Sequence, residues 1–122
     1  MRTIILGSGK GTNAKALLDA SIHNQLGATE IVAVYSDVAG SGILETAQSH
    51  EVEFRHIDAN PTTAKLAGED EQTWIEALSA DNPDLIVLAG FMKILQKPFL
   101  DCFPNSIINI HPSLLPSFKG LG

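Results

Sequence analysis

Near the end of the printed sequence, an amide and an imidazole follow a short run of apolar residues. Asn109 and His111 lie two positions apart, just before Pro112. Residues 106–110 are rich in isoleucine and predict a strand, in which side chains two positions apart share a face. An amide that donates to an oxyanion and an imidazole that moves a proton suit a reaction at a carbonyl group. The plain alternative is a strand end where Asn caps a turn and His fills a gap.

A glycine-rich loop follows the first apolar run of the chain. It reads Gly-Ser-Gly-Lys-Gly-Thr-Asn at residues 7–13. Backbone N–H groups at the start of a helix bind anions, and Gly9 and Gly11 let the backbone approach closely. Thr12 or Asn13 could cap the helix and contact a phosphate oxygen. We therefore expect a phosphate as the ligand of this loop.

A dinucleotide site is a rival interpretation of the same loop. Gly9-x-Gly11-x-x-Ala14 fits a permitted fingerprint, and Asp37 stands where a ribose ligand is expected. The loop lacks the Gly-Lys-Ser/Thr spacing of a P-loop. An NAD-binding domain of an oxidoreductase therefore stays open, as does a tight turn without a ligand.

A third loop, Gly-Phe-Met-Lys-Ile-Leu at residues 90–95, follows another apolar run. Such an apolar lip could hold a flat aromatic ligand through side-chain contacts and backbone hydrogen bonds. Residues of this kind more often belong to the core, so the loop alone does not decide between the two interpretations.

Alternating strands and helices must position these loops. The pattern predicts strands at 3–6, 31–35, 52–57, 85–89 and 106–110, and helices at 13–24, 42–50, 69–80 and 98–103. Continuous apolar strands joined by helices indicate an α/β fold, with a doubly wound, mostly parallel, Rossmann-like sheet in one domain over residues 1–122. Ligands of such sheets bind beyond the carboxyl ends of the strands, so one cleft could gather the three loops.

Composition narrows the class of protein. The 122 residues carry a net charge of −6 with eight Lys and Arg, which disfavours nucleic acid and anionic membranes as partners. No apolar run reaches the roughly 20 residues that cross a bilayer, so we expect a cytoplasmic protein. The single cysteine, Cys102, cannot form an internal disulfide and supplies no metal cluster.

Three segments together resemble one enzyme family. Residues 8–13, 88–95 and 108–116 are similar to the phosphoribosylglycinamide formyltransferases, folate-dependent enzymes of purine synthesis. The resemblance covers the whole chain but only the first part of the enzyme. It therefore implies a formyltransferase fold truncated after the fifth strand, without the family's downstream catalytic aspartate, and a chain with little activity of its own.

The resemblance also implies a reaction and its residues. The family transfers a formyl group from 10-formyltetrahydrofolate, the co-substrate, to the amine of glycinamide ribonucleotide, without a metal. The implied residues are His111 and Asn109 for catalysis, Gly11, Thr12 and Asn13 for the substrate phosphate, and Met92, Lys93, Ile94, Leu95, Asn109 and Lys65 for the folate.

Related proteins share the terminal motif. Methionyl-tRNA formyltransferase binds a nucleic acid, which the acidic composition disfavours. Formyltetrahydrofolate deformylase usually has a second histidine where this chain has Pro112. A non-catalytic paralogue that binds only phosphate is a further alternative. An exposed strand edge would also allow the chain to form a homo-oligomer.

Overall fold

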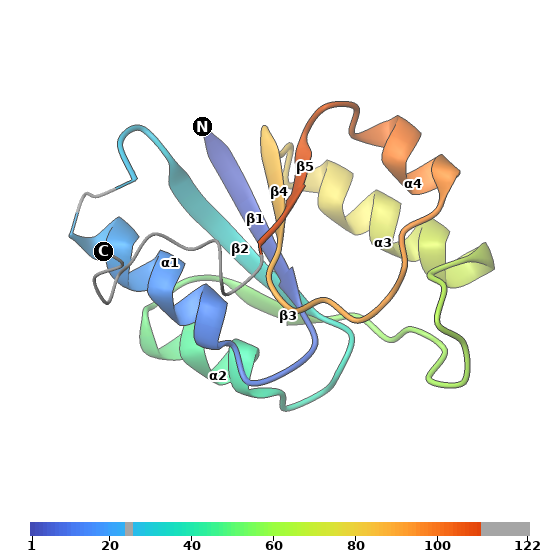
Figure 1. Cartoon of the computed structure of the whole chain (residues 1–122), viewed down its shortest axis with the longest axis horizontal. Coiled ribbons are helices and arrows are strands. Elements are labelled where there is room, and N and C mark those ends of the chain that lie inside the picture. Colours follow the sequence, from blue (N-terminus) through green and yellow to red (C-terminus); the bar gives the residue numbers. More distant parts are fainter. Residues whose placement is uncertain (24–25, 111–122) are drawn as a thin grey trace.

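The computed structural model describes residues 1–23 and 26–110, which form a five-stranded parallel sheet with helices on both faces (Figure 1). The strands are β1 (Arg2–Gly7), β2 (Glu30–Ser36), β3 (Phe54–His56), β4 (Leu85–Leu88) and β5 (Ile107–Asn109). The helices are α1 (Thr12–Ile22), α2 (Gly42–Ser49), α3 (Gly68–Ala80) and α4 (Lys97–Cys102). The predicted doubly wound α/β fold is confirmed.

Strand β1 runs through the middle of the sheet and is buried on both faces. Ile4, Ile5 and Leu6 are each 0% exposed. Side chains alternate across a strand, so Ile4 and Leu6 enter one hydrophobic cluster while Ile5 enters the other. This double burial explains why the strand reads as a continuous apolar run rather than as an alternating pattern.

Two helices cover each face of the sheet. On one face α1 and α2 contribute Leu18 and Ile43 to the core, and on the other α3 and α4 contribute Trp74 and Phe99 (Figure 1). The indole N–H of Trp74 also donates to the backbone carbonyl of Asp58 at 3.3 Å. The segment between β3 and α3 is thereby attached to the core by a fully buried aromatic ring.

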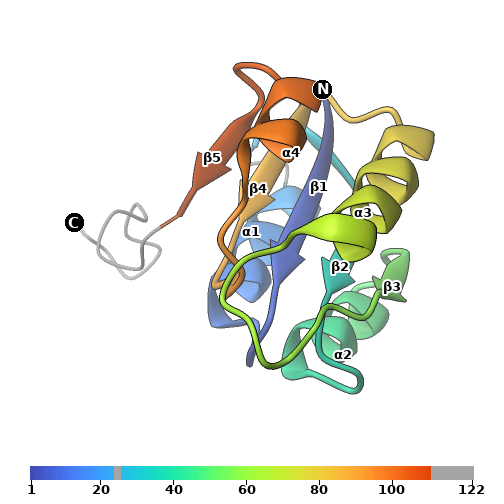
Figure 2. The same cartoon turned by 90° about the vertical axis from the view of Figure 1, so that its right-hand side faces the viewer.

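The strand order is β3-β2-β1-β4-β5, which leaves β3 and β5 at opposite edges (Figure 2). From β1 the chain first builds β2 and β3 on one side and then returns to add β4 and β5 on the other. The direction of winding therefore reverses between β1 and β4. In sheets of this kind the crevice for ligands lies at that point, beyond the carboxyl ends of the strands.

Most predicted elements differ from the observed ones by one or two residues in length, and the third predicted strand differs by three. The strand expected at 52–57 is reduced to β3, whose three residues are all exposed, because an edge strand with short pairing buries little surface. The helix expected at 13–24 begins at Thr12 and ends at Ile22. Its expected end at residue 24 lies outside the described residues.

Candidate active site

The glycine loop after β1 is shaped by its contact with α2. Gly11 has a φ of 82°, and a Cβ there would lie 2.6 Å from the Cα of Ile43. The backbone N–H of Ile43 donates to the carbonyl of Gly9 at 3.0 Å. A Cβ on Gly9 would meet no atom within 4 Å. Gly11 is therefore required by backbone conformation and packing, whereas Gly9 borders open space.

Helix α1 begins directly after this loop. Its N-cap is Gly11, whose carbonyl accepts a hydrogen bond from the N–H of Lys15 at 2.7 Å, and no described side chain caps the helix. The suggestion that Thr12 or Asn13 caps α1 was wrong, because both residues already lie inside its first turn. The first N–H groups of α1 thus point beyond the helix end, where they attract anions.

A hollow of about 350 Å³ joins the first and fourth strands at the reversal point. Its walls are residues 9–13 from the glycine loop together with Ala89 and Gly90 from the end of β4. The phosphate candidates Gly11, Thr12 and Asn13 are among these residues. The structure therefore brings two of the three predicted loops to one cavity, at the crevice that the winding of the sheet defines.

Ser8 links three loops at this crevice. It is 9% exposed, and its hydroxyl Oγ lies 2.5 Å from Oδ1 of Asp37. The same oxygen accepts a hydrogen bond from the backbone N–H of Met92 at 2.9 Å. The Ser8 N–H donates to the carbonyl of Gly90 at 3.1 Å. Sequence reasoning assigned no role to Ser8, although its position directly after a central strand was a signal that it faces the crevice.

The expected folate residues differ in what their side chains do. Met92 and Ile94 are 74% and 55% exposed, so their apolar side chains face solvent. Leu95 packs against the hydrophobic cluster that contains Trp74. The lip predicted at residues 90–95 is therefore part core and part exposed surface.

Lys93 forms hydrogen bonds within the chain. Its ammonium group donates to the backbone carbonyls of Asn60 at 2.6 Å and Thr63 at 2.5 Å. Lys65 lies beside the same loop, because its backbone pairs with Ile94 in a parallel bridge. Residues 60–65 are thus attached directly to the expected folate loop.

Asn109 ends strand β5. It is exposed and pairs with Leu88, which in turn pairs with Leu6. Asn109 therefore lies level with the end of β1 but two strands away, about 10 Å at the usual strand spacing. His111 lies outside the described residues, so its predicted place beside Asn109 stays a prediction.

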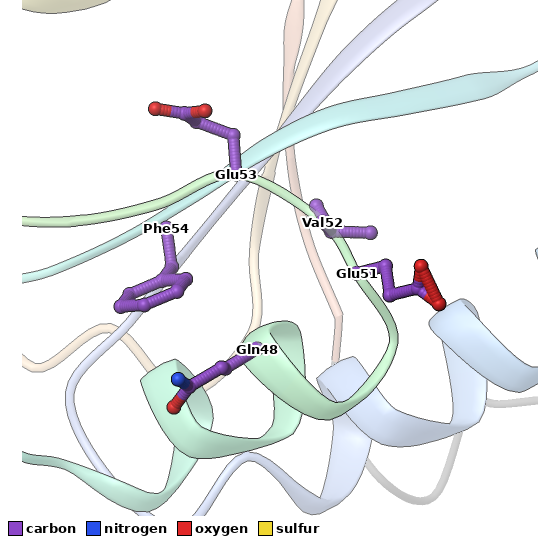
Figure 3. Close-up of a pocket in the computed structure, with 5 residues that line it drawn as sticks. All are labelled: Gln48, Glu51, Val52, Glu53 and Phe54. Carbon is purple, nitrogen blue, oxygen red and sulfur yellow. The ribbon is translucent and has the colours of Figure 1, made fainter.

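A second hollow, of about 440 Å³, lies at the β3 edge and is lined by Gln48, Glu51, Val52, Glu53 and Phe54. Figure 3 shows Glu53 and Phe54 on opposite sides of the strand, with Glu51 directed toward α1. Glu53 also forms an ion pair with Arg55 at 3.5 Å. Side chains that diverge in this way do not converge on one ligand.

Residues 1–23 and 26–110 offer neither a metal-binding cluster nor a membrane-spanning helix. No cluster of three or more His, Cys, Asp or Glu side chains suitable for a metal ion occurs there. No helix in this part of the chain is long and apolar enough to cross a membrane.

The fold and the hollow define a doubly wound α/β protein with its crevice between β1 and β4. A family model described as formyl transferase matches residues 1–122, and the chain belongs to this family. The phosphoribosylglycinamide formyltransferase of Escherichia coli (strain K12) is 36% identical over 121 residues, which are 99% of this chain and 56% of that protein.

Two further comparisons support the same family assignment. The trifunctional purine biosynthetic protein adenosine-3 of Gallus gallus is 39% identical over 120 residues, 98% of this chain and 12% of that protein. The crystal structure of glycinamide ribonucleotide transformylase 1 from Symbiobacterium toebii matches with a TM-score of 0.80 and 39% identity, covering 99% of this chain and 56% of that one. The chain thus spans about half the length of the Escherichia coli relative.

Proposed function

We propose that this chain forms the ribonucleotide-binding part of a phosphoribosylglycinamide formyltransferase. The reaction is transfer of a formyl group from 10-formyltetrahydrofolate to the amine of glycinamide ribonucleotide. One observation carries the proposal: a chain of the formyl transferase family has a hollow at its reversal point, lined by the glycine loop and the end of β4. The names of the relatives, which refer to formyl transfer in purine synthesis, supply the substrate class.

The ribonucleotide phosphate is assigned to Gly11, Thr12 and Asn13. The backbone N–H groups of the first turn of α1 and the positive end of its dipole attract a phosphate at this place. Open space beside Gly9 leaves room for the phosphate oxygens. The phosphate would therefore anchor the substrate at one end of the hollow.

The formyl folate is assigned to residues along the neighbouring loop and strand. They are Met92, Lys93, Ile94, Leu95, Asn109 and Lys65. The exposed apolar side chains of Met92 and Ile94 suit a flat aromatic ring, and the bridge between Lys65 and Ile94 brings a cation near them. Lys93 would act through backbone position, because its ammonium group already binds two carbonyls.

Asn109 and His111 are assigned to the chemical step. The amine of the ribonucleotide attacks the formyl carbon, and the carbonyl oxygen becomes an oxyanion. Asn109 and protonated His111 stabilise that charge. The bond between the formyl carbon and the folate nitrogen then breaks as His111 gives its proton to that nitrogen, and the imidazole takes up the proton that the attacking amine loses, which releases tetrahydrofolate. The step needs no metal, since two hydrogen-bond donors supply the charge stabilisation.

The dinucleotide alternative meets a specific obstacle. The candidate ribose ligand Asp37 already accepts a hydrogen bond from Ser8 through Oδ1. A ribose would have to use the remaining oxygen or displace Ser8. Formyl transfer therefore fits the described contacts better than nicotinamide chemistry, and a cytoplasmic location remains the prediction that accompanies it.

Calorimetric titration of glycinamide ribonucleotide into the chain tests the proposal, with inorganic phosphate and NAD titrated in parallel. We expect the ribonucleotide to bind more tightly than phosphate, and NAD neither to bind nor to compete. Binding of NAD without the ribonucleotide would favour a dinucleotide domain and contradict the proposal.

A further inference from the structure

The two loops that meet at the hollow are fixed in different ways. The glycine loop is attached to α2 through the hydrogen bond from Ile43 to Gly9 and the close packing of Gly11 on Ile43. The loop after β4 is attached at its far end through Ile94, whose N–H donates to the carbonyl of Ala64 at 2.8 Å. Near its start the loop is attached to Ser8 twice: the Ser8 N–H donates to the carbonyl of Gly90 at 3.1 Å, and the Ser8 hydroxyl, the side-chain contact, accepts from the N–H of Met92 at 2.9 Å.

Chemistry fixes the direction of the hydrogen bonds at Ser8. The carboxylate of Asp37 can only accept, so the single hydroxyl proton of Ser8 lies on the bond to Oδ1. The lone pairs of Oγ are then available to the N–H of Met92. The bond to a charged acceptor polarises the hydroxyl and strengthens its second bond. The result is one chain of hydrogen bonds, from Met92 through Ser8 to Asp37.

Asp37 is itself held in place by a serine cluster at the end of β2. The hydroxyl of Ser36 accepts a hydrogen bond from the N–H of Val38 at 3.1 Å and another from the hydroxyl of Ser41 at 2.9 Å. The turn that carries Asp37 is therefore fixed from within. Asp37 accepts the hydrogen bond from Ser8 and does not move freely. The Ser8 hydroxyl can therefore hold Met92 at a defined position.

We propose that Ser8 is a positioning residue for the formyl-folate loop: its hydroxyl fixes the backbone at Met92 against the phosphate-binding loop. The inference rests on the proposed function, because it assigns residues 92–95 to the folate. It predicts a selective defect. Loss of the hydroxyl disturbs the folate side of the crevice, whereas the glycine loop keeps its own attachment to α2.

The test compares Ser8→Ala with the unaltered chain by calorimetry, with 5-formyltetrahydrofolate and glycinamide ribonucleotide as probes. We expect the affinity for the folate to fall about tenfold and the affinity for the ribonucleotide to change less than twofold. Ser8→Thr, which keeps a hydroxyl, should restore most of the folate affinity. Ser106→Ala is the matched control. The Ser106 hydroxyl donates to the backbone carbonyl of Pro104, just before β5 begins, at the opposite end of that strand from Asn109.

A double-mutant cycle separates this role from general stability. Because Ser8 acts through Asp37, Asp37→Ala added to Ser8→Ala should cause little further loss of folate affinity. Amide hydrogen exchange at Met92 should accelerate in Ser8→Ala but not in Ser106→Ala. This second readout needs no ligand, so it remains informative if a variant binds weakly.

The outcomes distinguish the two proposals. If the unaltered chain binds neither probe, the proposed function fails and the assignment of Ser8 to a folate loop fails with it. If the chain binds both probes and Ser8→Ala keeps its full folate affinity and slow exchange at Met92, the role of Ser8 is overturned while the proposed function stands. Equal losses for both probes would also contradict the positioning role.

Discussion

Nε2 of His50 lies 2.7 Å from Oδ1 of Asp19, and this contact joins the end of α2 to α1. The other ring nitrogen, Nδ1, lies 2.8 Å from the carbonyl oxygen of Thr46. Both partners can only accept hydrogen bonds, so the geometry favours an imidazolium that donates from both nitrogens. The hydrogen bond to Asp19 and then that to Thr46 raise the pKa of His50 above its ordinary 6.5.

This ion pair predicts a pH-dependent stability. Because the folded-state pKa of His50 is raised, its stabilisation is complete below about pH 6.5 and declines as pH rises through the folded-state value. Hydrogen bonds from Lys15 and His50 lower the pKa of Asp19 below 3.8. The stabilisation that its charged carboxylate contributes is therefore lost only as pH falls through that lower pKa. The pair should therefore stabilise the fold most between about pH 4 and 6.5.

Thermal unfolding of His50→Gln measures this contribution. We expect its Tm to lie below that of the unaltered chain at pH 5.5 and the difference to shrink by pH 9. His23→Gln, at an exposed position just after α1, is the control and should show no such trend. A constant Tm difference across this range would contradict the charged form of His50.

Gly11→Ala should destabilise the chain and weaken phosphate binding. Gly11 has a φ of 82°, and its new Cβ would lie 2.6 Å from the Cα of Ile43. Left-handed backbone at a residue other than glycine costs of order 1–3 kcal/mol, and the steric contact adds to that cost. Urea unfolding measures the loss. Gly9→Ala is the control, because open space surrounds that position, and it should change stability by less than about 0.5 kcal/mol.

Lys93→Gln should loosen the segment before α3. The variant removes the ammonium group that bonds to the carbonyls of Asn60 and Thr63. We expect faster amide hydrogen exchange at Leu66, whose N–H donates to the carbonyl of Ile94. Lys97→Gln, which removes an exposed ion pair in α4, should leave this exchange unchanged. Unaltered exchange in the Lys93 variant would show that the two hydrogen bonds do not hold the segment.

Asn109→Ala and His111→Ala should each lower kcat for formyl transfer in an active enzyme that contains this chain. Removal of one oxyanion donor typically costs about 10²–10³ in kcat. Asn109→Asp should lose at least as much, because a carboxylate repels the developing charge. Gln72→Ala, on the exposed surface of α3, is a control. Near-normal turnover in Asn109→Ala or His111→Ala would reject the assigned roles.

The surface around β5 predicts self-association at high concentration. Ile108 is 48% exposed, and together with Ile110 and Val87 it borders an apolar hollow of about 140 Å³. Contact between two such surfaces would remove apolar area from water. Light scattering across a concentration series should detect the association, and Ile108→Thr should reduce it. A monomer at every concentration would contradict this expectation.

The residue pattern was enough to predict the class of fold. Apolar runs such as residues 3–6 and 85–89 predicted buried parallel strands, because burial on both faces leaves a direct mark in residue type. It also marked the glycine loop, since a tight strand-to-helix turn restricts which residues fit. The position of the crevice at the strand ends followed from the same reasoning.

The contacts that hold the crevice together could not be predicted from the residue pattern. Ser8 meets Met92 across 84 positions of sequence, and Lys93 reaches back 33 positions to Asn60. Hydropathy indicates whether a side chain is buried. It does not indicate which strand lies next to the strand that carries that side chain. Strand order decides those neighbours, so the contacts that fix the loops emerged only when β4 was placed against β1.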